Sequence, residues 1–207
     1  MAQDQELPGM LVVLSGPSGV GKTTVAARLV EKGGYVRSIS VTTRAPRGEE
    51  VDGRDYRFQT VEQFESLCAR AELIEHAEVH GKFYGTPKQP LRDALARNQV
   101  MLLVIDVDGA FQVKHSRLDA LLVFLLPPDR HELARRLGER GTEDVSQRTV
   151  RLNRAQIEEQ RAREFYDHLV VNDDLERCVE KVHELVLQAR RGLAQRLQAG
   201  EKLYPGL

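Results

Sequence analysis

The sequence has no tryptophan, only two cysteines and no surplus of charge of either sign. Cys68 and Cys178 are far apart and form no paired motif, which favours small buried thiols in a reducing compartment. The 30 basic and 31 acidic side chains nearly cancel, which argues against the broad basic surface that nucleic-acid binding needs. Because no apolar run approaches membrane-spanning length and the first residues lack a secretion signal, we expect a cytoplasmic protein with no membrane contact.

The sequence of 207 residues is long enough for one domain with inserted subdomains. Of its six histidines, His76 and His80 fall in a segment that we interpret as a strand, on one face of a sheet. No cysteine or further histidine lies near them, so we expect no zinc site. The sequence does not distinguish a monomer from a homo-oligomer.

A glycine-rich octapeptide at positions 16–23 matches the phosphate-binding loop pattern. The apolar run 11–14 before it predicts a buried strand, and a helix is predicted from Lys22 to near Gly33. Glycines let backbone N–H groups converge on phosphate, and the helix N-terminus adds positive charge. We expect Lys22 to reach the β- and γ-phosphates of a nucleoside triphosphate and Thr23 to ligate Mg²⁺. The predicted triphosphate-binding residues of this segment are Gly16, Pro17, Ser18, Gly19, Val20, Gly21, Lys22, Thr23 and Thr24.

Alternating strand and helix patterns predict an α/β fold, with a largely parallel sheet core and helices on both faces. The other predicted strands are 36–43, 56–58, 73–80, 100–106, 121–126 and 168–171. The other predicted helices are 61–71 with a Thr60–Gln63 capping box, 87–98 capped by Thr86, 129–137, 145–164 and 175–197.

Two segments interrupt this alternation. The polar segment 37–88 is a candidate acceptor-binding subdomain, and the arginine-rich segment 138–166 is a candidate lid. The core then comprises 10–36, 89–137 and 167–197. We expect residues 1–9 and 198–207 to be flexible termini.

Several polar residues have the right type and setting for chemistry on phosphates. Arg44 and Arg47 suit an oxyanion, although a solvated charged loop explains them equally well. Glu75 and Tyr84 are candidates for one wall of a small pocket, whereas spacing alone favours an exposed acid and a core tyrosine. Asp106 ends an apolar strand, as does the acid that helps to hold Mg²⁺ beside a phosphate loop. A further set of arginines could stabilise a transferring phosphoryl group, some being plain surface charge: Arg135, Arg136, Arg140, Arg148, Arg151 and Arg154.

These motifs, taken in order, resemble guanylate kinase. The quoted pieces are Gly-Pro-Ser-Gly-x-Gly-Lys-Thr, Thr-Thr-Arg-x-Pro-Arg, Asp-Gly-x-Asp-Tyr-x-Phe, Ile-Glu-x-Ala with Tyr-Gly-Thr, Ile-Asp-Val, Arg-Gly-Thr and Val-Asn-Asp-Asp. The resemblance spans residues 10–187, and its acceptor-site pieces are specific to that family. It implies a phosphate-loop core with a nucleoside-monophosphate subdomain and a lid. The implied reaction is Mg²⁺-dependent transfer from ATP to GMP, giving ADP and GDP.

The resemblance also implies roles for individual residues. Ser40, Glu75 and Thr86 would bind guanine, and Arg44, Arg47, Tyr56 and Tyr84 would hold the GMP phosphate, with Glu50 just after the arginines. Lys22, Arg136, Arg140 and Arg151 would flank the transferring phosphoryl group, with Arg44 also counted as catalytic. Asn172 would lie near the adenine of ATP, and Thr23 and Asp106 would hold Mg²⁺, Asp106 through water.

One departure from the family pattern concerns the strand that ends at Asp106. The family has an acid two residues earlier, where Val104 stands here, and glutamine two residues later, where Asp108 stands. This puts in doubt any Mg²⁺ or Lys22 contact that the earlier acid makes.

Two other functions remain open at this stage. A peptide-binding scaffold domain of the same fold would lack a complete phosphate loop, which is intact here. A kinase for another acceptor, such as a ribosyl phosphate, would lack Glu75 and the Tyr84-Gly85-Thr86 element, which are both present.

Overall fold

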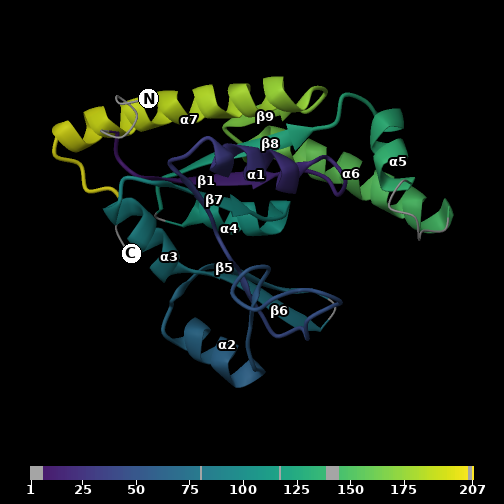
Figure 1. The fold of residues 1–207 in the computed structure, drawn as a ribbon, viewed down its shortest axis with the longest axis horizontal. Coiled ribbons are helices and arrows are strands. Elements are labelled where there is room, and N and C mark those ends of the chain that lie inside the picture. The colour runs from purple at the N-terminus through teal and green to yellow at the C-terminus, as the bar shows by residue number, and fades with distance from the viewer. Residues whose placement is uncertain (1–6, 80, 117, 139–144, 205–206) are drawn as a thin grey trace.

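The computed structural model describes residues 7–79, 81–116, 118–138, 145–204 and 207. Its core is a five-stranded sheet of order β2-β7-β1-β8-β9, in which every pair is parallel. The strands are β1 (Met10–Ser15), β2 (Tyr35–Arg37), β7 (Val100–Val104), β8 (Ala120–Leu126) and β9 (His168–Val171). The prediction of an α/β fold with a parallel sheet is confirmed (Figure 1).

Helices cover both faces of this sheet, which explains why residues 10–14 of β1 are all apolar. Met10, Val12 and Leu14 join one buried cluster, whereas Leu11 and Val13 join another. The first cluster includes α1 (Lys22–Glu31) and α7 (Leu175–Gln198), and the second includes α3 (Lys88–Ala96) and α4 (Val107–His115). In Figure 1, α7 lies above the sheet and α3 and α4 lie below it. A central strand that is buried on both faces therefore favours a nearly continuous apolar run, and in β1 only the last residue, Ser15, is polar.

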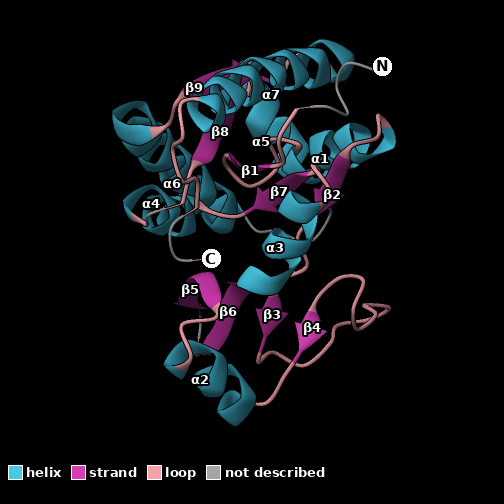
Figure 2. Ribbon diagram, turned by 90° about the vertical axis from the view of Figure 1, so that its left-hand side faces the viewer, coloured by secondary structure: helices cyan, strands magenta, loops and turns pink. Residues whose placement is uncertain are grey.

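Most of the predicted segment 37–88, from β3 to β6, forms a separate lobe, seen in the lower half of Figure 2. Its four-stranded sheet has the order β4-β3-β6-β5, and α2 (Val61–Ala69) packs on it through Phe64. The strands are β3 (Val41–Thr42), β4 (Arg57–Phe58), β5 (Leu73–Val79) and β6 (Lys82–Pro87). The predicted capping box of α2 is present, with both the Thr60 and the Gln63 side chains bonded to backbone N–H groups.

Two predictions at the edges of this lobe are wrong. The single strand 36–43 is in fact β2 and β3, which belong to different sheets, because the chain leaves the core between them. Thr86 does not cap a helix: it lies in β6, and α3 begins at Lys88 after Pro87, without a side-chain cap. A local alternation of residues continues across a change of sheet, so the pattern could not reveal it.

Two elements, β6 and α4, were not predicted. β6 follows Gly81 and contains Gly85, and glycine weakens the local signal for a strand. Gly109 likewise interrupts α4, although Asp106 caps this helix by accepting a 2.9 Å hydrogen bond from Gly109 N. The N-cap and the spacing of the buried Val107, Ala110 and Val113 were the signals that could have identified α4.

The arginine-rich segment forms the end of α5 (Arg130–Gly138) and then α6 (Val145–Phe165). The predicted helix over 145–164 is confirmed, with Val150 and Ile157 exposed and Ala155 and Ala162 buried. Ala155 packs against Leu133 of α5, while Ala162 packs near β8. That this segment acts as a lid stays a prediction.

Several described residues within the termini that we expected to be flexible, 1–9 and 198–207, contact the core. Leu11 N donates a 3.3 Å hydrogen bond to the Tyr204 hydroxyl, and Leu203 packs against the core. The buried guanidinium of Arg190 donates to the carbonyls of Leu7 and Pro8. None of the helices in the described part of the chain has the length and apolar character that a membrane crossing requires.

Candidate functional site

Three predicted site elements lie at the carboxyl ends of three core strands, β1, β7 and β9. The phosphate loop follows β1, Asp106 follows β7 and Asn172 follows β9. Because these strands are parallel, their carboxyl ends meet at one edge of the sheet. That edge is where α/β folds of this kind bind their ligands.

The loop is folded tightly around Lys22. Its ammonium Nζ donates to the carbonyls of Gly16, at 2.6 Å, and Pro17, at 3.0 Å. A Cβ added at Gly16 would lie 2.6 Å from the Leu125 carbonyl oxygen. Gly21 has a φ of 103°, and a Cβ there would lie 2.5 Å from the Asn172 amide nitrogen. The close contacts on both sides of the loop therefore require these glycines.

Asn172 and Arg136 support the loop from its outer side. The buried Asn172 amide donates to the Val20 carbonyl at 2.8 Å, and Arg136 donates to the carbonyls of Val20 and Asn172, at 3.4 and 3.3 Å. Arg136 also donates to Glu132 at 2.7 Å, and together with Arg135 it lowers the pKa of that carboxyl to about 2. The pocket that Arg136 lines, of about 420 Å³, also contains Gly19, Gly21, Thr24, Asn172, Asp173 and Leu175.

Lys22 lines a second pocket, of about 380 Å³, on the other side of the loop. Asp106 enters it from the end of β7, and α6 supplies Arg151. The complete lining is Gly16, Ser18, Lys22, Asp106, Arg151, Arg154, Ala155 and Glu158. The structure thus brings Lys22, Asp106 and Arg151 together, while Arg136 lines the other pocket. Arg140 lies outside the described residues.

The second lobe contains a cluster of side chains around one buried arginine, Arg44. Arg44 is 8 % exposed and makes a two-pronged ion pair with Glu50, at 2.9 and 3.0 Å. This guanidinium lowers the pKa of Glu50, and its own pKa is raised chiefly by the same pair. Its carbon atom Cζ lies 5.3 Å from the ring centre of Tyr56, and that ring is 6.1 Å from the ring of Tyr84. The fixed fork, backed by aromatic rings, suits an oxyanion.

Arg47 contributes to this cluster through its backbone. Its N–H donates to Glu50 Oε2 at 2.8 Å, while the residue itself is exposed. The two predicted arginines therefore differ: Arg44 is held in place, and Arg47 lies at the surface of the same loop.

Glu75 is buried, which is the opposite of what spacing alone favoured. It is 7 % exposed and accepts a 2.6 Å hydrogen bond from the Thr86 hydroxyl. Burial raises the pKa of Glu75 to about 7, against the Thr86 hydrogen bond, and the charge of Asp106 adds to the rise. A Cβ added at Gly109 would lie 3.1 Å from Glu75 Oε2, so glycine leaves room for the carboxylate beside α4.

The neighbouring strands bring Ser40 close to this pair. Val41 of β3 pairs with Gly85 of β6, so the next residue on each strand is Ser40 and Thr86. Ser40 is half-buried. The predicted guanine-binding residues therefore share one region of the small sheet, although they come from segments about 46 positions apart in the sequence.

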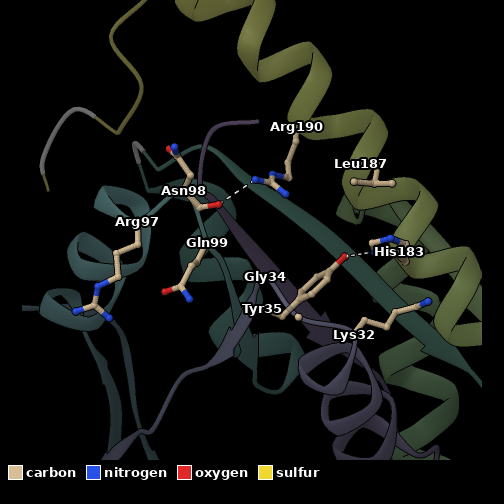
Figure 3. A pocket seen from close by; sticks show the side chains of 10 residues that line it. Lys32, Gly34, Tyr35, Arg97, Asn98, Gln99, His183, Leu187 and Arg190 are labelled. Atoms are coloured by element: carbon tan, nitrogen blue, oxygen red, sulfur yellow. Dashed lines mark hydrogen bonds between the residues drawn. The ribbon is translucent and has the colours of Figure 1, made fainter. Parts of the chain in front are cut away.

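A larger cavity, of about 790 Å³, lies at the opposite, amino end of the core sheet (Figure 3). Its polar groups already bond one another: the Tyr35 hydroxyl lies 2.6 Å from His183 Nδ1, and Arg190 donates to the Asn98 carbonyl at 2.9 Å. These contacts join α7 to β2 and to the turn between α3 and β7. The cavity contains none of the predicted site residues, and we assign it a structural role.

Sequence reasoning missed two features of the site. The contacts of Arg136 with the loop backbone carry no sequence signal, because they depend on how α5 packs. The sequence also did not reveal that Gly109 leaves room for Glu75, because this contact depends on how α4 packs against β5. His76 lies in β5, as predicted, whereas His80, which was predicted to share its sheet face, lies outside the described residues.

A phosphate loop at the carboxyl edge of a parallel sheet, next to a lobe with a buried arginine and acid, defines a phosphate-loop kinase with a separate second lobe. A family model described as guanylate kinase matches residues 9–189. The chain belongs to the guanylate kinase family.

Individual relatives agree with this family. The chain is 45 % identical over 184 residues to a guanylate kinase of Myxococcus xanthus, covering 88 % of each chain. It is 48 % identical over 180 residues to one of Gloeobacter violaceus, covering 86 % of this chain and 87 % of the other. A crystal structure of guanylate kinase from Anaplasma phagocytophilum matches with a TM-score of 0.71 and 36 % identity, over 90 % of this chain and 89 % of that one.

Proposed function

We propose that this protein transfers the γ-phosphoryl group of ATP to GMP, giving ADP and GDP. The observation that carries the proposal is the buried Glu75–Thr86 pair in the same lobe as the Arg44–Glu50 cluster. A phosphate loop alone selects a triphosphate and not an acceptor. The pair and the cluster together suit a ligand that has both a hydrogen-bonding base and an anion.

ATP would bind along the carboxyl edge of the core sheet. The loop 16–23 would hold its phosphates, and the pocket beside Asn172 would take the adenosine end. Lys22 would exchange the Gly16 and Pro17 carbonyls for phosphate oxygens, because a phosphate offers it a full negative charge. Arg136 would act by holding the loop from outside, and Arg140 and Arg151 would flank the transferring group.

Mg²⁺ would be held by the Thr23 hydroxyl and by Asp106 through water. The donor set fits this ion, since Mg²⁺ takes oxygen ligands and uses one or two carboxylates together with substrate phosphates. Among the described residues, no group of three or more acidic, histidine or cysteine side chains forms an all-protein metal site. When bound, the ion would neutralise charge on the phosphates.

GMP would bind in the 37–88 lobe. Arg44, Arg47, Tyr56 and Tyr84 would contact its phosphate, with Glu50 keeping the Arg44 fork in position. Ser40, Glu75 and Thr86 would contact guanine. Guanine presents N1–H and N2–H₂ as adjacent donors, and an ionised carboxylate accepts both.

A coupled assay of ADP release tests this function with GMP, dGMP, AMP and CMP as acceptors. We expect turnover with GMP and dGMP and very little with AMP or CMP. Activity on none of the four would favour another acceptor or a scaffold role. In that event, calorimetric titration with ATP would separate the two, because a scaffold domain would not bind it.

A further inference from the structure

Helix α6 brings one carboxylate into the phosphate-loop pocket, and this carboxylate has no role in the function proposed above. Glu158 lines this pocket with Lys22 and Asp106, and its side chain is only 15 % exposed. The next residue, Glu159, is 36 % exposed and pairs with Arg163 at 2.6 Å, away from the pocket. Two adjacent glutamates on one helix thus have different environments.

Glu158 faces both kinds of charge across the pocket. Arg154, four residues earlier, donates to its Oε1 at 2.9 Å, and Lys22 adds a favourable charge from α1. Burial nonetheless raises the pKa of Glu158, and the carboxylate of Asp106 adds to the rise. Two acids that share a partly buried pocket repel each other, and a cation between them relieves the repulsion.

The strand side of the pocket supplies only one acid. Val104, two residues before Asp106, is apolar and packs against the cluster formed by α1 and α7. Mg²⁺ bound to nucleotide phosphates uses one or two protein carboxylates. Asp106 and Glu158 are the two acids that line the pocket beside Lys22, and they come from different elements, the end of β7 and α6.

We propose that Glu158 is the second carboxylate of the Mg²⁺·ATP site, supplied by α6 in place of an acid at position 104. The inference rests on the proposed function, in that ATP and Mg²⁺ occupy this pocket. In this proposal α6 contacts the metal through Glu158 as well as the phosphates through Arg151. The simpler explanation is that Glu158 only forms an i,i+4 ion pair with Arg154 and stabilises the helix.

Calorimetric titration with ATP, without GMP and at a series of Mg²⁺ concentrations, separates the two explanations. Removing a residue that supports a metal typically costs about 10- to 100-fold in metal affinity. Mg²⁺ should increase ATP affinity in both proteins. We therefore expect the Mg²⁺ concentration that gives half of the maximal increase to be about tenfold higher for Glu158→Gln than for the intact protein. Without Mg²⁺, Glu158→Gln should bind ATP as tightly as the intact protein or more tightly, since a negative charge near the phosphates is gone. The matched control Glu159→Gln should keep the Mg²⁺ dependence of the intact protein.

The outcomes are distinct. An unchanged Mg²⁺ requirement in Glu158→Gln overturns the inference, as does equal weakening of ATP binding with and without Mg²⁺, which indicates a structural role. Glu158→Asp, which keeps the charge, should recover part of the Mg²⁺ affinity and covers the case in which the glutamine variant folds poorly. Failure of the intact protein to bind ATP, or to phosphorylate GMP, would instead count against the proposed function.

Discussion

The Thr86 hydroxyl donates a 2.6 Å hydrogen bond to Oε1 of Glu75, and both residues are buried. They lie on the adjacent strands β6 and β5 of the four-stranded sheet. A buried carboxylate is costly unless its lone pairs are used. Thr86 donates to one oxygen of Glu75, and the N–H groups of guanine are suited to donate to the lone pairs that remain.

Glu75 should determine which base is accepted. AMP would place its bare N1 acceptor against the carboxylate and leave buried oxygens unpaired, and sites of this kind discriminate by up to about 10⁴–10⁵-fold. We expect Glu75→Ala to lose most GMP activity while ATP binding persists. The measurement is the ratio of kcat/KM for GMP over AMP in the intact protein and the variant. An unchanged ratio would mean that Glu75 does not contact the base.

The same carboxylate should make GMP binding depend on pH. Its pKa is about 7 in the folded protein, so acidification below pH 7 protonates it and removes one of the two acceptors that guanine needs. We expect kcat/KM for GMP to fall as the pH decreases through about 7, with ATP binding much less affected. Glu75→Gln, which cannot ionise, should lack this acidic limb. If the limb persists in that variant, another group causes it.

Arg44 should act on GMP and not on ATP. Each charge-assisted hydrogen bond is worth about 1.5–3 kcal/mol, so Arg44→Ala should raise KM for GMP about 10- to 100-fold. Arg44→Lys should recover little, because a single ammonium cannot replace the fork that now pairs with Glu50. Arg92→Ala, an exposed arginine on α3, serves as the control. A shift in ATP saturation instead would place Arg44 outside the acceptor site.

Gly21→Ala should damage the phosphate loop through a steric clash. The new Cβ would lie 2.5 Å from the Asn172 amide nitrogen. Gly33 has a similar φ of 85°, but a Cβ added there would have no neighbouring atom within 4 Å. Gly33→Ala therefore carries the backbone strain without the clash. We expect Gly21→Ala to weaken ATP binding at least tenfold more than Gly33→Ala does, by calorimetry. Equal effects in the two variants would show that backbone strain alone is responsible.

Lys22→Ala should reduce turnover far more than it destabilises the fold. The ammonium is needed most while charge develops on the leaving phosphate, and loss of one such contact costs about 10²–10³-fold in kcat. Its ammonium donates to the Gly16 and Pro17 carbonyls within the loop itself, so thermal unfolding should change little. Lys32→Ala, at the far end of the same helix, should retain turnover. Normal kcat in Lys22→Ala would contradict the phosphate-loop assignment.

The sequence by itself determined those parts of this protein in which the chemistry is local. The loop 16–23, the apolar core strands and the Thr60–Gln63 capping box all depend on residues a few positions apart, so their patterns predicted them correctly. The motifs around Arg44 and Glu75 also indicated the guanylate kinase family, which the family model confirms.

Only the tertiary structure decided the environment of each functional side chain. Burial of Glu75, its bond from Thr86 and the space at Gly109 require strands β5 and β6 to pack beside α4. The contacts of Arg136 with the loop, and the entry of Glu158 into the Lys22 pocket, likewise require α5 and α6 to lie over the sheet edge. Burial and charge pairing arise from groups distant in sequence, and a local pattern contains no information about which of them will meet.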